Sequence, residues 1–156
     1  MSLKLIIKTT NIVIFLSIIL ANTIYAEEKY EFTIMGNSLQ NDIVKLPDKS
    51  IFNVFSGKGA FSDNKGNIGD FSSRGVRQTN NKGVLTKLTA VLIFKTTGGS
   101  EMWGSPTRAA TDLLAGAGYF DVFSTKGNLK ELLGKRCQYA LTNTKNKSFI
   151  MQGFCK

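Results

Sequence analysis

Clusters of turn-forming residues recur every 8–15 residues along most of this chain and divide it into short runs. The clearest clusters are DNKGN at Asp63–Asn67, TNNKG at Thr79–Gly83 and TTGGS at Thr96–Ser100. The run between the last two, VLTKLTAVLIF at Val84–Phe94, is rich in β-branched and aromatic residues and contains neither Gly nor Pro. This spacing, with almost no helical periodicity, predicts an all-β sandwich or barrel with Val84–Phe94 as a central strand.

Eight or nine strands are expected, and that number favours a closed antiparallel barrel of about eight strands, because closure removes exposed strand edges. Leu39–Ser50 is polar and is expected to be irregular, whereas Leu129–Leu133 is expected to form one helical turn. The expected strands are Lys29–Met35, Ile51–Phe55, Lys58–Ser62, Ile68–Gln78, Val84–Phe94, Glu101–Arg108, Ala115–Phe123, Arg136–Asn143 and Phe149–Cys155.

The N-terminal segment, residues 1–26, has the pattern of a signal peptide. It contains two lysines, a nine-residue apolar run at Ile12–Leu20 and a small residue, Ala26, before the acidic pair that follows. The apolar run is too short for a membrane span of about 20 residues. We therefore expect a periplasmic or secreted protein whose residues 27–156 form a single β-barrel domain with no membrane span after cleavage. An uncleaved anchor is the alternative, since Ile24 is not the small residue usual at that position.

Charge and composition narrow the functional classes. After residue 26 the chain carries eighteen basic and eleven acidic residues, a net charge of +7, but no run of three lysines. Dispersed charge of this kind favours a soluble surface over a polyanion-binding one, so no nucleic-acid partner is expected. The sequence contains no histidine. The usual general base, the commonest metal ligand and the Ser-His and Cys-His nucleophile pairs are therefore missing, and neither cofactor nor metal is expected.

The C-terminal hairpin predicts a disulfide by register alone. If Thr144–Ser148 is a five-residue loop, Tyr139 faces Gly153 and Cys137 faces Cys155. Directly opposed residues on antiparallel strands have Cα atoms about 4.5–5.5 Å apart, within the range of a disulfide. Two cysteines in an exported protein are typical of a structural bond, and no CxxC motif indicates a redox role.

The same counting across the two loops beside the central strand predicts a polar cluster inside the barrel. Arg108 and Arg74 would both oppose Leu88, and Asp70 would oppose Leu92, on the parity that faces the core. Buried charges are costly unless paired. The cluster is therefore either a structural ion pair, or the result of a one-residue register slip that would move it outside, or a ligand-binding site for an anionic or carbonyl group formed by Asp70, Arg74 and Arg108.

The opposite parity predicts an apolar patch on the outer wall, formed by Phe71, Val91, Ile93 and Trp103. In this register Lys95 opposes Glu101 and Ile93 opposes Trp103. A patch of this kind is either covered by the N-terminal segment or forms a subunit interface, which would make the protein a homo-oligomer.

Several stretches resemble a group of short, uncharacterised exported bacterial proteins. These are GKGAFSDNKGNIGD, EMWGSPTRA and AGAGYFDVFSTKGNLKELLGKRCQYAL with the final Cys, within Ser56–Cys155. More distantly, the last of them is similar to the late strands of allene oxide cyclase and dirigent barrels. That resemblance implies an eight-stranded antiparallel barrel with an apolar interior, frequently trimeric. No position here matches the catalytic carboxylate and water-binding residues of those enzymes, so the resemblance assigns no active site.

Three functions are compatible with these observations. The first is an exported non-enzymatic barrel that binds a small apolar or amphipathic ligand in its interior. The second is an envelope structural or interaction protein that acts through its outer apolar patch. The third is a cyclase-like or dirigent-like enzyme that shapes a reactive intermediate without histidine. The sequence favours a non-enzymatic role.

Overall fold

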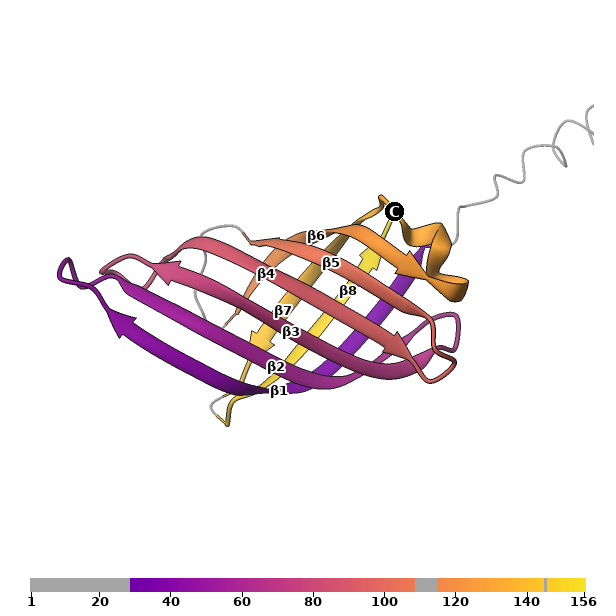
Figure 1. The fold of residues 1–156 in the computed structure, drawn as a ribbon, viewed down its shortest axis with the longest axis horizontal. Helices are drawn as coiled ribbons and strands as arrows, with labels where there is room; N and C mark the ends of the chain where they lie inside the picture. The colour runs from indigo at the N-terminus through magenta and orange to yellow at the C-terminus, as the bar shows by residue number, and fades with distance from the viewer. Residues whose placement is uncertain (1–28, 109–114, 145) are drawn as a thin grey trace, which may run out of the picture.

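The computed structural model describes residues 29–108, 115–144 and 146–156, which form a closed barrel of eight antiparallel strands (Figure 1). Each strand pairs with the next along the chain, and the last pairs with the first. The predicted fold class is thus confirmed, while the predicted signal peptide lies outside the described residues. The elements are β1 (Tyr30–Lys45), β2 (Ile51–Asp63), β3 (Ile68–Thr79), β4 (Leu85–Thr96), β5 (Glu101–Arg108), β6 (Ala115–Lys126), the 3-10 helix η1 (Gly127–Leu132), β7 (Arg136–Asn143) and β8 (Ser148–Cys155).

Two expected breaks are absent from the first hairpin. β1 continues through the polar segment to Lys45, and β2 runs unbroken through Ser56 and Gly57. The reason is mutual pairing: from Gln40 onward β1 has a partner on β2 at every residue, after a bulge at Leu39. Backbone pairing of this kind satisfies N–H and C=O groups whatever the side chains, so weak β propensity is overridden by the neighbouring strand.

Five of the loops have the same five-residue geometry. The N–H of the first residue donates to the carbonyl oxygen of the fifth, at N···O distances of 2.7–3.0 Å. The fourth residue has a positive φ in each loop, which favours glycine and is taken by lysine in two of them. The loops are Leu46–Ser50, Asp63–Asn67, Asn80–Val84, Thr96–Ser100 and Thr144–Ser148.

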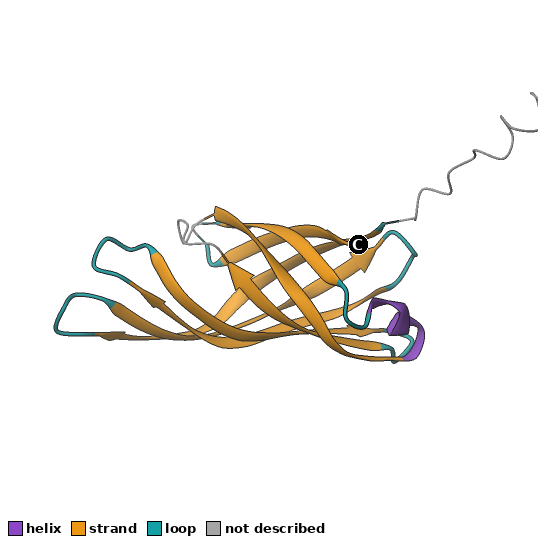
Figure 2. Cartoon of the chain, turned by 90° about the horizontal axis from the view of Figure 1, so that it is seen from above, coloured by secondary structure: helices purple, strands orange, loops and turns teal. Residues whose placement is uncertain are grey.

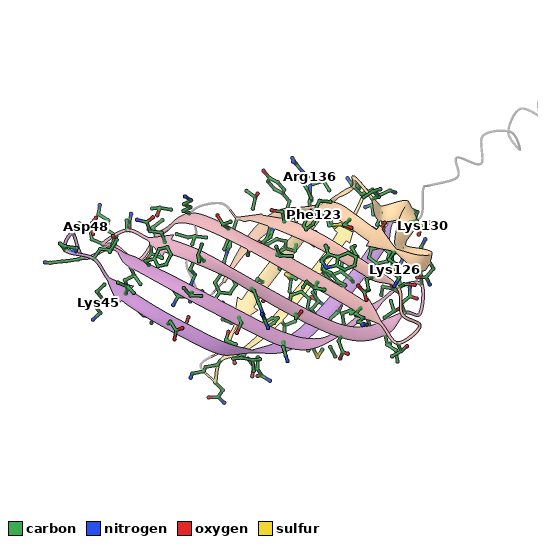
Figure 3. The ribbon with its side chains drawn as sticks, viewed as in Figure 1. Lys45, Asp48, Phe123, Lys126, Lys130 and Arg136 are labelled. Atoms are coloured by element: carbon green, nitrogen blue, oxygen red, sulfur yellow. A yellow bond between two sulfur atoms is a disulfide. The ribbon has the colours of Figure 1, made fainter. Side chains whose placement is uncertain are left out.

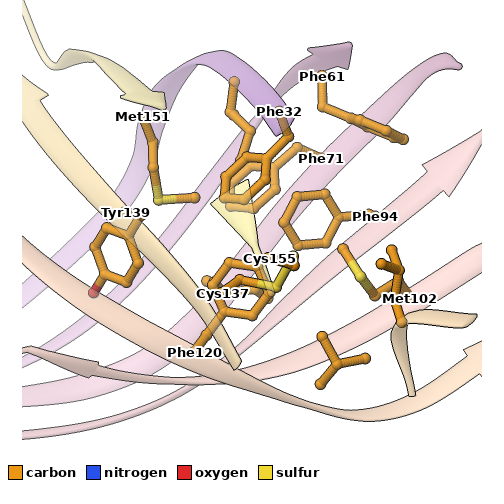
Figure 4. Close-up of a cluster of buried hydrophobic side chains, with 14 of the residues drawn as sticks. Phe32, Phe61, Phe71, Phe94, Met102, Phe120, Cys137, Tyr139, Met151 and Cys155 are labelled. Carbon is orange, nitrogen blue, oxygen red and sulfur yellow. A yellow bond between two sulfur atoms is a disulfide. The ribbon is translucent and has the colours of Figure 1, made fainter. Parts of the chain in front are cut away.

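One half of the barrel interior is filled by aromatic rings. Phe94 is fully buried, and its ring centroid lies 5.3–5.9 Å from those of four other phenylalanines. Leu129 and Leu132 of η1 are 1% exposed and cover this end of the barrel. Figure 4 shows the cluster, whose rings around Phe94 are Phe32, Phe61, Phe71 and Phe120.

The predicted disulfide is confirmed. Cys137 and Cys155 are directly opposed on β7 and β8, with Cα atoms 3.9 Å apart, and both lie in the aromatic core (Figure 4). Tyr139 faces Gly153 as the register predicted. The Tyr139 ring, however, lies against Gly118, at a position that a Cβ would occupy. Pairing a glycine with an aromatic ring in this way fills the gap that the missing side chain leaves.

In the part of the chain that the structure describes, the barrel is open at the end away from η1, because its strands have unequal lengths. β1 to β4 have 12–16 residues, whereas β5, β7 and β8 have eight. The β1–β2 and β3–β4 hairpins therefore extend beyond the rest of the barrel as a curved trough (Figures 1 and 2). In addition, β4 pairs with β5 only at Leu92–Lys95. The wall between the first half of β4 and the end of β5 thus has no hydrogen-bonded ladder.

Among the described residues, the helical segment is far too short and polar to cross a lipid bilayer.

Candidate functional site

A cavity of about 110 Å³ lies between the aromatic core and the open end of the barrel. Its walls come from seven of the eight strands and are mostly apolar. Leu88 and Pro106 line it where β4 and β5 separate. Because Pro106 has no N–H to donate, it suits a strand edge that lacks a ladder on one side. The other apolar lining residues are Phe55, Phe71, Leu85, Ala90, Leu92, Leu141, Phe149 and Met151.

The polar lining carries positive charge toward the mouth. It includes two arginines, Arg77 of β3 and Arg108 of β5, together with Tyr139 and Asn143 of β7. Ser38, Ser56 and Ser73 contribute hydroxyl groups. No aspartate or glutamate is among the described residues that line the cavity. The site therefore combines an apolar interior with a cationic mouth.

Arg77 is held by a small polar network on the inner face of the two long hairpins. Its Nη2 lies 3.3 Å from Asn41 Oδ1, and its guanidinium lies 5.6 Å from the ring centroid of Phe55. The same Asn41 oxygen accepts a 2.7 Å hydrogen bond from Asn53 Nδ2. Asn53 is 3% exposed, and its Oδ1 is buried without a hydrogen-bond partner among the described residues. The buried Oδ1 of Asn53 thus lies in the same network as the half-buried guanidinium of Arg77.

The two arginines affect each other electrostatically. Burial lowers the pKa of the Arg77 guanidinium, and the positive charge of Arg108 lowers it further. Arginine nonetheless stays protonated at neutral pH, since its ordinary pKa lies far above neutral. Two like charges that face one partly desolvated cavity repel each other, so an anion between them would relieve an existing cost. A guanidinium can also bind a carboxylate or phosphate with two parallel hydrogen bonds.

Tyr139 adds a neutral donor to the site. The residue is 7% exposed, and burial raises the pKa of its phenol, while the charge of Arg108 acts in the opposite direction. The phenol is therefore protonated well above neutral pH. A protonated hydroxyl group in this position can donate a hydrogen bond to an acceptor in the cavity.

Of the three residues predicted to form the interior cluster, Arg108 lines the cavity and the other two do not. Arg108 lies on the same cavity as Leu88, although β4 and β5 form no ladder there. Asp70 pairs with Lys95 and Arg74 pairs with Val91, and both side chains are exposed on the outer wall. The predicted inward positions of Asp70 and Arg74 are therefore wrong.

The cause is the register of the β3–β4 hairpin. Its loop is Asn80–Val84, one residue later than predicted, which moves the partner of each β4 residue by two positions along β3. A bulge at Thr86 moves the partner by one position more, so that Leu88 pairs with Arg77 instead of Arg74. The bulge turns Leu85 into the core, where it is 3% exposed, and leaves Thr86 outside. Because side chains alternate along a strand, this single insertion exchanges the inner and outer faces of β3 relative to the prediction.

The same change affects the predicted outer patch. Val91, Ile93 and Trp103 lie on the outer wall, and Ile93 pairs with Trp103 as predicted. Phe71 does not belong with them, since it is 3% exposed and its ring packs edge-to-face against Phe94. Its predicted outer position is wrong for the same reason as that of Asp70.

Sequence reasoning missed Arg77, which takes the inward place predicted for Arg74 and pairs with Leu88. Part of the signal was present. In the loops after β2 and β4 the glycine with positive φ is the fourth residue, and the same rule applied to Gly83 gives Asn80–Val84 as the loop. The bulge at Thr86 has no comparable signal, because no Gly, Asn or Pro marks it.

Within the part of the chain that the structure describes, no group of three or more His, Cys, Asp or Glu side chains is placed to hold a metal ion.

Comparison with known proteins bears on the fold. No protein-family model matches the chain, and no curated protein matches it in sequence. A crystal structure of an enzyme from Penicillium herquei is similar to it, with a TM-score of 0.57 and 14% sequence identity, over 79% of this chain and 90% of that chain. At this identity the likeness concerns the barrel architecture alone. The resemblance to exported bacterial proteins and to cyclase and dirigent barrels stays a prediction beyond that architecture.

Proposed function

We propose that this protein is an exported, non-enzymatic barrel that binds a small amphipathic anion. The anionic group would lie between Arg77 and Arg108 at the mouth, and the apolar part would enter the cavity behind them. The observation that supports this most directly is the lining itself, in which two arginines are the charged groups that face a mostly apolar space. Binding sites for small molecules commonly have this composition, an apolar pocket with a few polar groups that fix orientation.

The cavity volume limits the apolar part of the ligand. A volume of about 110 Å³ is somewhat below that of an engineered cavity of about 150 Å³ that holds benzene. A single ring or a short alkyl chain therefore suits the interior, while a larger group would extend through the gap between β4 and β5.

A binding role is preferred to an enzymatic one on chemical grounds. The chain has no histidine, and the described cavity lining offers arginine, tyrosine, asparagine and serine as its polar groups. Neither an arginine nor a tyrosine of raised pKa is a good general base near neutral pH. The similar fungal protein is an enzyme, but at 14% sequence identity this does not assign an activity to the present chain.

Arg77→Met is expected to weaken binding of octanoate about tenfold or more, because it removes a charge-assisted hydrogen bond worth about 1.5–3 kcal/mol. Isothermal titration calorimetry with octanoate, octanol and octylammonium separates head group from tail. Wild-type protein should bind octanoate best and octylammonium least. Affinity for octanol should be little changed by Arg77→Met. Leu88→Trp, which fills the interior, should weaken octanoate and octanol alike.

Arg74→Met is the matched control, since Arg74 lies on the same strand but on the outer wall. It should leave octanoate affinity unchanged. Equal losses in the two arginine variants would mean that the cavity is not the binding site. If neither octanoate nor octanol binds the wild-type protein, the proposal of an amphipathic ligand is wrong.

The outer wall supports a second candidate function, an envelope interaction or self-association. Val91, Ile93 and Trp103 lie there, and Phe123 is 54% exposed at a bulge between β5 and β6, next to the residue that pairs with Trp103. Apolar side chains gathered on a sheet face are typical of an interface.

Trp103→Lys is expected to reduce the size of any oligomer while the fold survives, because the substitution places a charge in the patch but leaves the core intact. Size-exclusion chromatography with light scattering and a thermal melt measure the two effects. Lys95→Ala, on the same outer wall, is the control. Unfolding of Trp103→Lys without a change in association would place Trp103 in a structural role instead.

A further inference from the structure

The β1–β2 hairpin exposes apolar side chains on both of its faces. On one face Val44, Phe52 and Val54 are 53%, 38% and 40% exposed, and Val44 pairs directly with Phe52. On the other face Ile43 is 53% exposed, because the hairpin extends past the shorter strands that would otherwise cover it. Leu39, at the bulge where this extension begins, is 60% exposed. β2 also pairs with β3 along this extension, but a single-layered sheet with exposed apolar groups on both faces cannot bury them within its own fold.

Positive charge surrounds these apolar side chains. Residues 42–54 and 76–88, which form the two extended hairpins, contain five basic and two acidic residues. One of the two carboxylates, Asp48, is occupied by its own turn, where it accepts hydrogen bonds from the N–H and the hydroxyl group of Ser50. Figure 3 shows Lys45 and Asp48 at this end of the molecule, far from the end that carries η1. The basic residues are Lys45, Lys49, Arg77, Lys82 and Lys87.

The opposite end of the barrel is also basic but is built differently. Lys126 and Lys130 lie there (Figure 3), and both are exposed. Acidic partners are close at hand at that end, as in the ion pair between Lys65 and Glu131. The leucines of η1 that cover that end, Leu129 and Leu132, are buried. Net charge alone therefore does not distinguish the two ends. Ile68 and Leu133 are exposed at the η1 end, whereas the β1–β2 hairpin at the open end exposes five apolar side chains within a basic rim.

We propose that the open end docks on an anionic lipid surface. In this arrangement the apolar side chains of the β1–β2 hairpin enter the interfacial region, and the lysines of both hairpins contact lipid phosphates. A surface that combines buried apolar area with several basic groups matches what interfacial binding requires. The mouth of the cavity then faces the bilayer, which is a source of amphipathic anions. Charge complementarity favours a lipid surface over a second copy of this chain, whose own open end carries the same sign.

Co-sedimentation of the purified protein with vesicles tests the proposal. Wild-type protein should partition onto vesicles of phosphatidylcholine mixed with phosphatidylglycerol and much less onto phosphatidylcholine alone. Val44→Ser combined with Phe52→Ser should lower the partition coefficient about tenfold or more, because it removes the apolar area that enters the bilayer. Lys45→Gln and Lys82→Gln should each lower it about fivefold, as expected for one basic residue near an anionic surface.

Lys126→Gln combined with Lys130→Gln is the control, since it removes from the other end as much charge as Lys45→Gln and Lys82→Gln remove together. It should change partitioning little. The lipid proposal is wrong if wild-type protein ignores the anionic vesicles or if this control lowers binding as much as the hairpin variants. It is also wrong if Val44→Ser with Phe52→Ser dissociates an oligomer in lipid-free solution, since a second copy would then occupy the surface.

The octanoate titration keeps this inference separate from the proposed ligand site. The Val44→Ser and Phe52→Ser variant should bind octanoate in solution as the wild type does, because neither residue lines the cavity. Loss of vesicle binding with octanoate affinity intact supports the docking surface. If Arg77→Met loses octanoate binding but largely retains vesicle binding, the result supports the ligand site and leaves the docking surface unaffected.

Discussion

Phe94→Ala is expected to destabilise the barrel by about 3–5 kcal/mol, the usual cost of removing a buried phenylalanine ring. Phe94 is 0% exposed and lies between rings contributed by four other strands, β1, β2, β3 and β6. Those rings come from a closed wall that cannot collapse inward, so most of the cavity should remain after the substitution. Since domains of this size are stable by about 5–15 kcal/mol, much of the protein's stability would be lost. Urea unfolding followed by the fluorescence of the single tryptophan measures the effect.

Val91→Ala provides a control on the same strand. Val91 is three residues away and lies on the outer wall, where it is 37% exposed. Its truncation should cost well under 1.5 kcal/mol, because the position is already hydrated. Similar losses in the two variants would mean that the two faces of β4 are not divided into core and surface as the register indicates.

Removing the disulfide is expected to cost about 3 kcal/mol. Cys137 and Cys155 are separated by 18 positions, and a loop of about that length restricts the unfolded chain by this amount in the chain-entropy account. The two side chains are also buried in the aromatic core, so Cys137→Ala with Cys155→Ala removes packing as well as the bond. Thermal melts of oxidised wild type, reduced wild type and the double variant separate these contributions.

The melting temperature of the wild type should fall on reduction, whereas that of the double variant should not respond to the reductant. The variant should be less stable than reduced wild type only by the packing contribution. If oxidised and reduced wild type melt at the same temperature, the bond does not constrain the unfolded chain, and hairpin pairing alone holds β7 to β8.

The two ends of the barrel are specialised in different ways. The end covered by η1 contains the aromatic cluster and the disulfide, which contribute stability. The open end contains the arginines, the asparagine network and the cavity, where burial of charge and of an unpaired acceptor works against stability. Groups that cost stability are often retained where a ligand compensates for them. This division is why substitutions in the closed half test the fold and substitutions in the open half test the site.

Local sequence determined most of the architecture. Turn clusters at regular spacing, with β-branched runs between them, were enough to predict an antiparallel barrel of about eight strands, and β5 and β7 have the predicted bounds. The C-terminal hairpin was predicted down to the disulfide, because a five-residue loop sets a register with no irregularity between Asn143 and Cys137. These features depend on residues that are close in sequence, and the sequence carries their signals directly.

The tertiary structure decided which side chains line the cavity. Placing Arg77 rather than Arg74 inside depended on one bulged residue, Thr86, whose identity gives no sign of the bulge. The bulge exists because the assembled barrel buries Leu85, a gain that appears only once the opposite wall is present. The gap between β4 and β5 likewise appears only in the pairing of the two strands, which ends at Leu92 and Gly104. Because side chains alternate between the two faces of a strand, a shift of one residue exchanges inward and outward positions. The residues that line the cavity therefore depend on packing between strands that are distant in sequence.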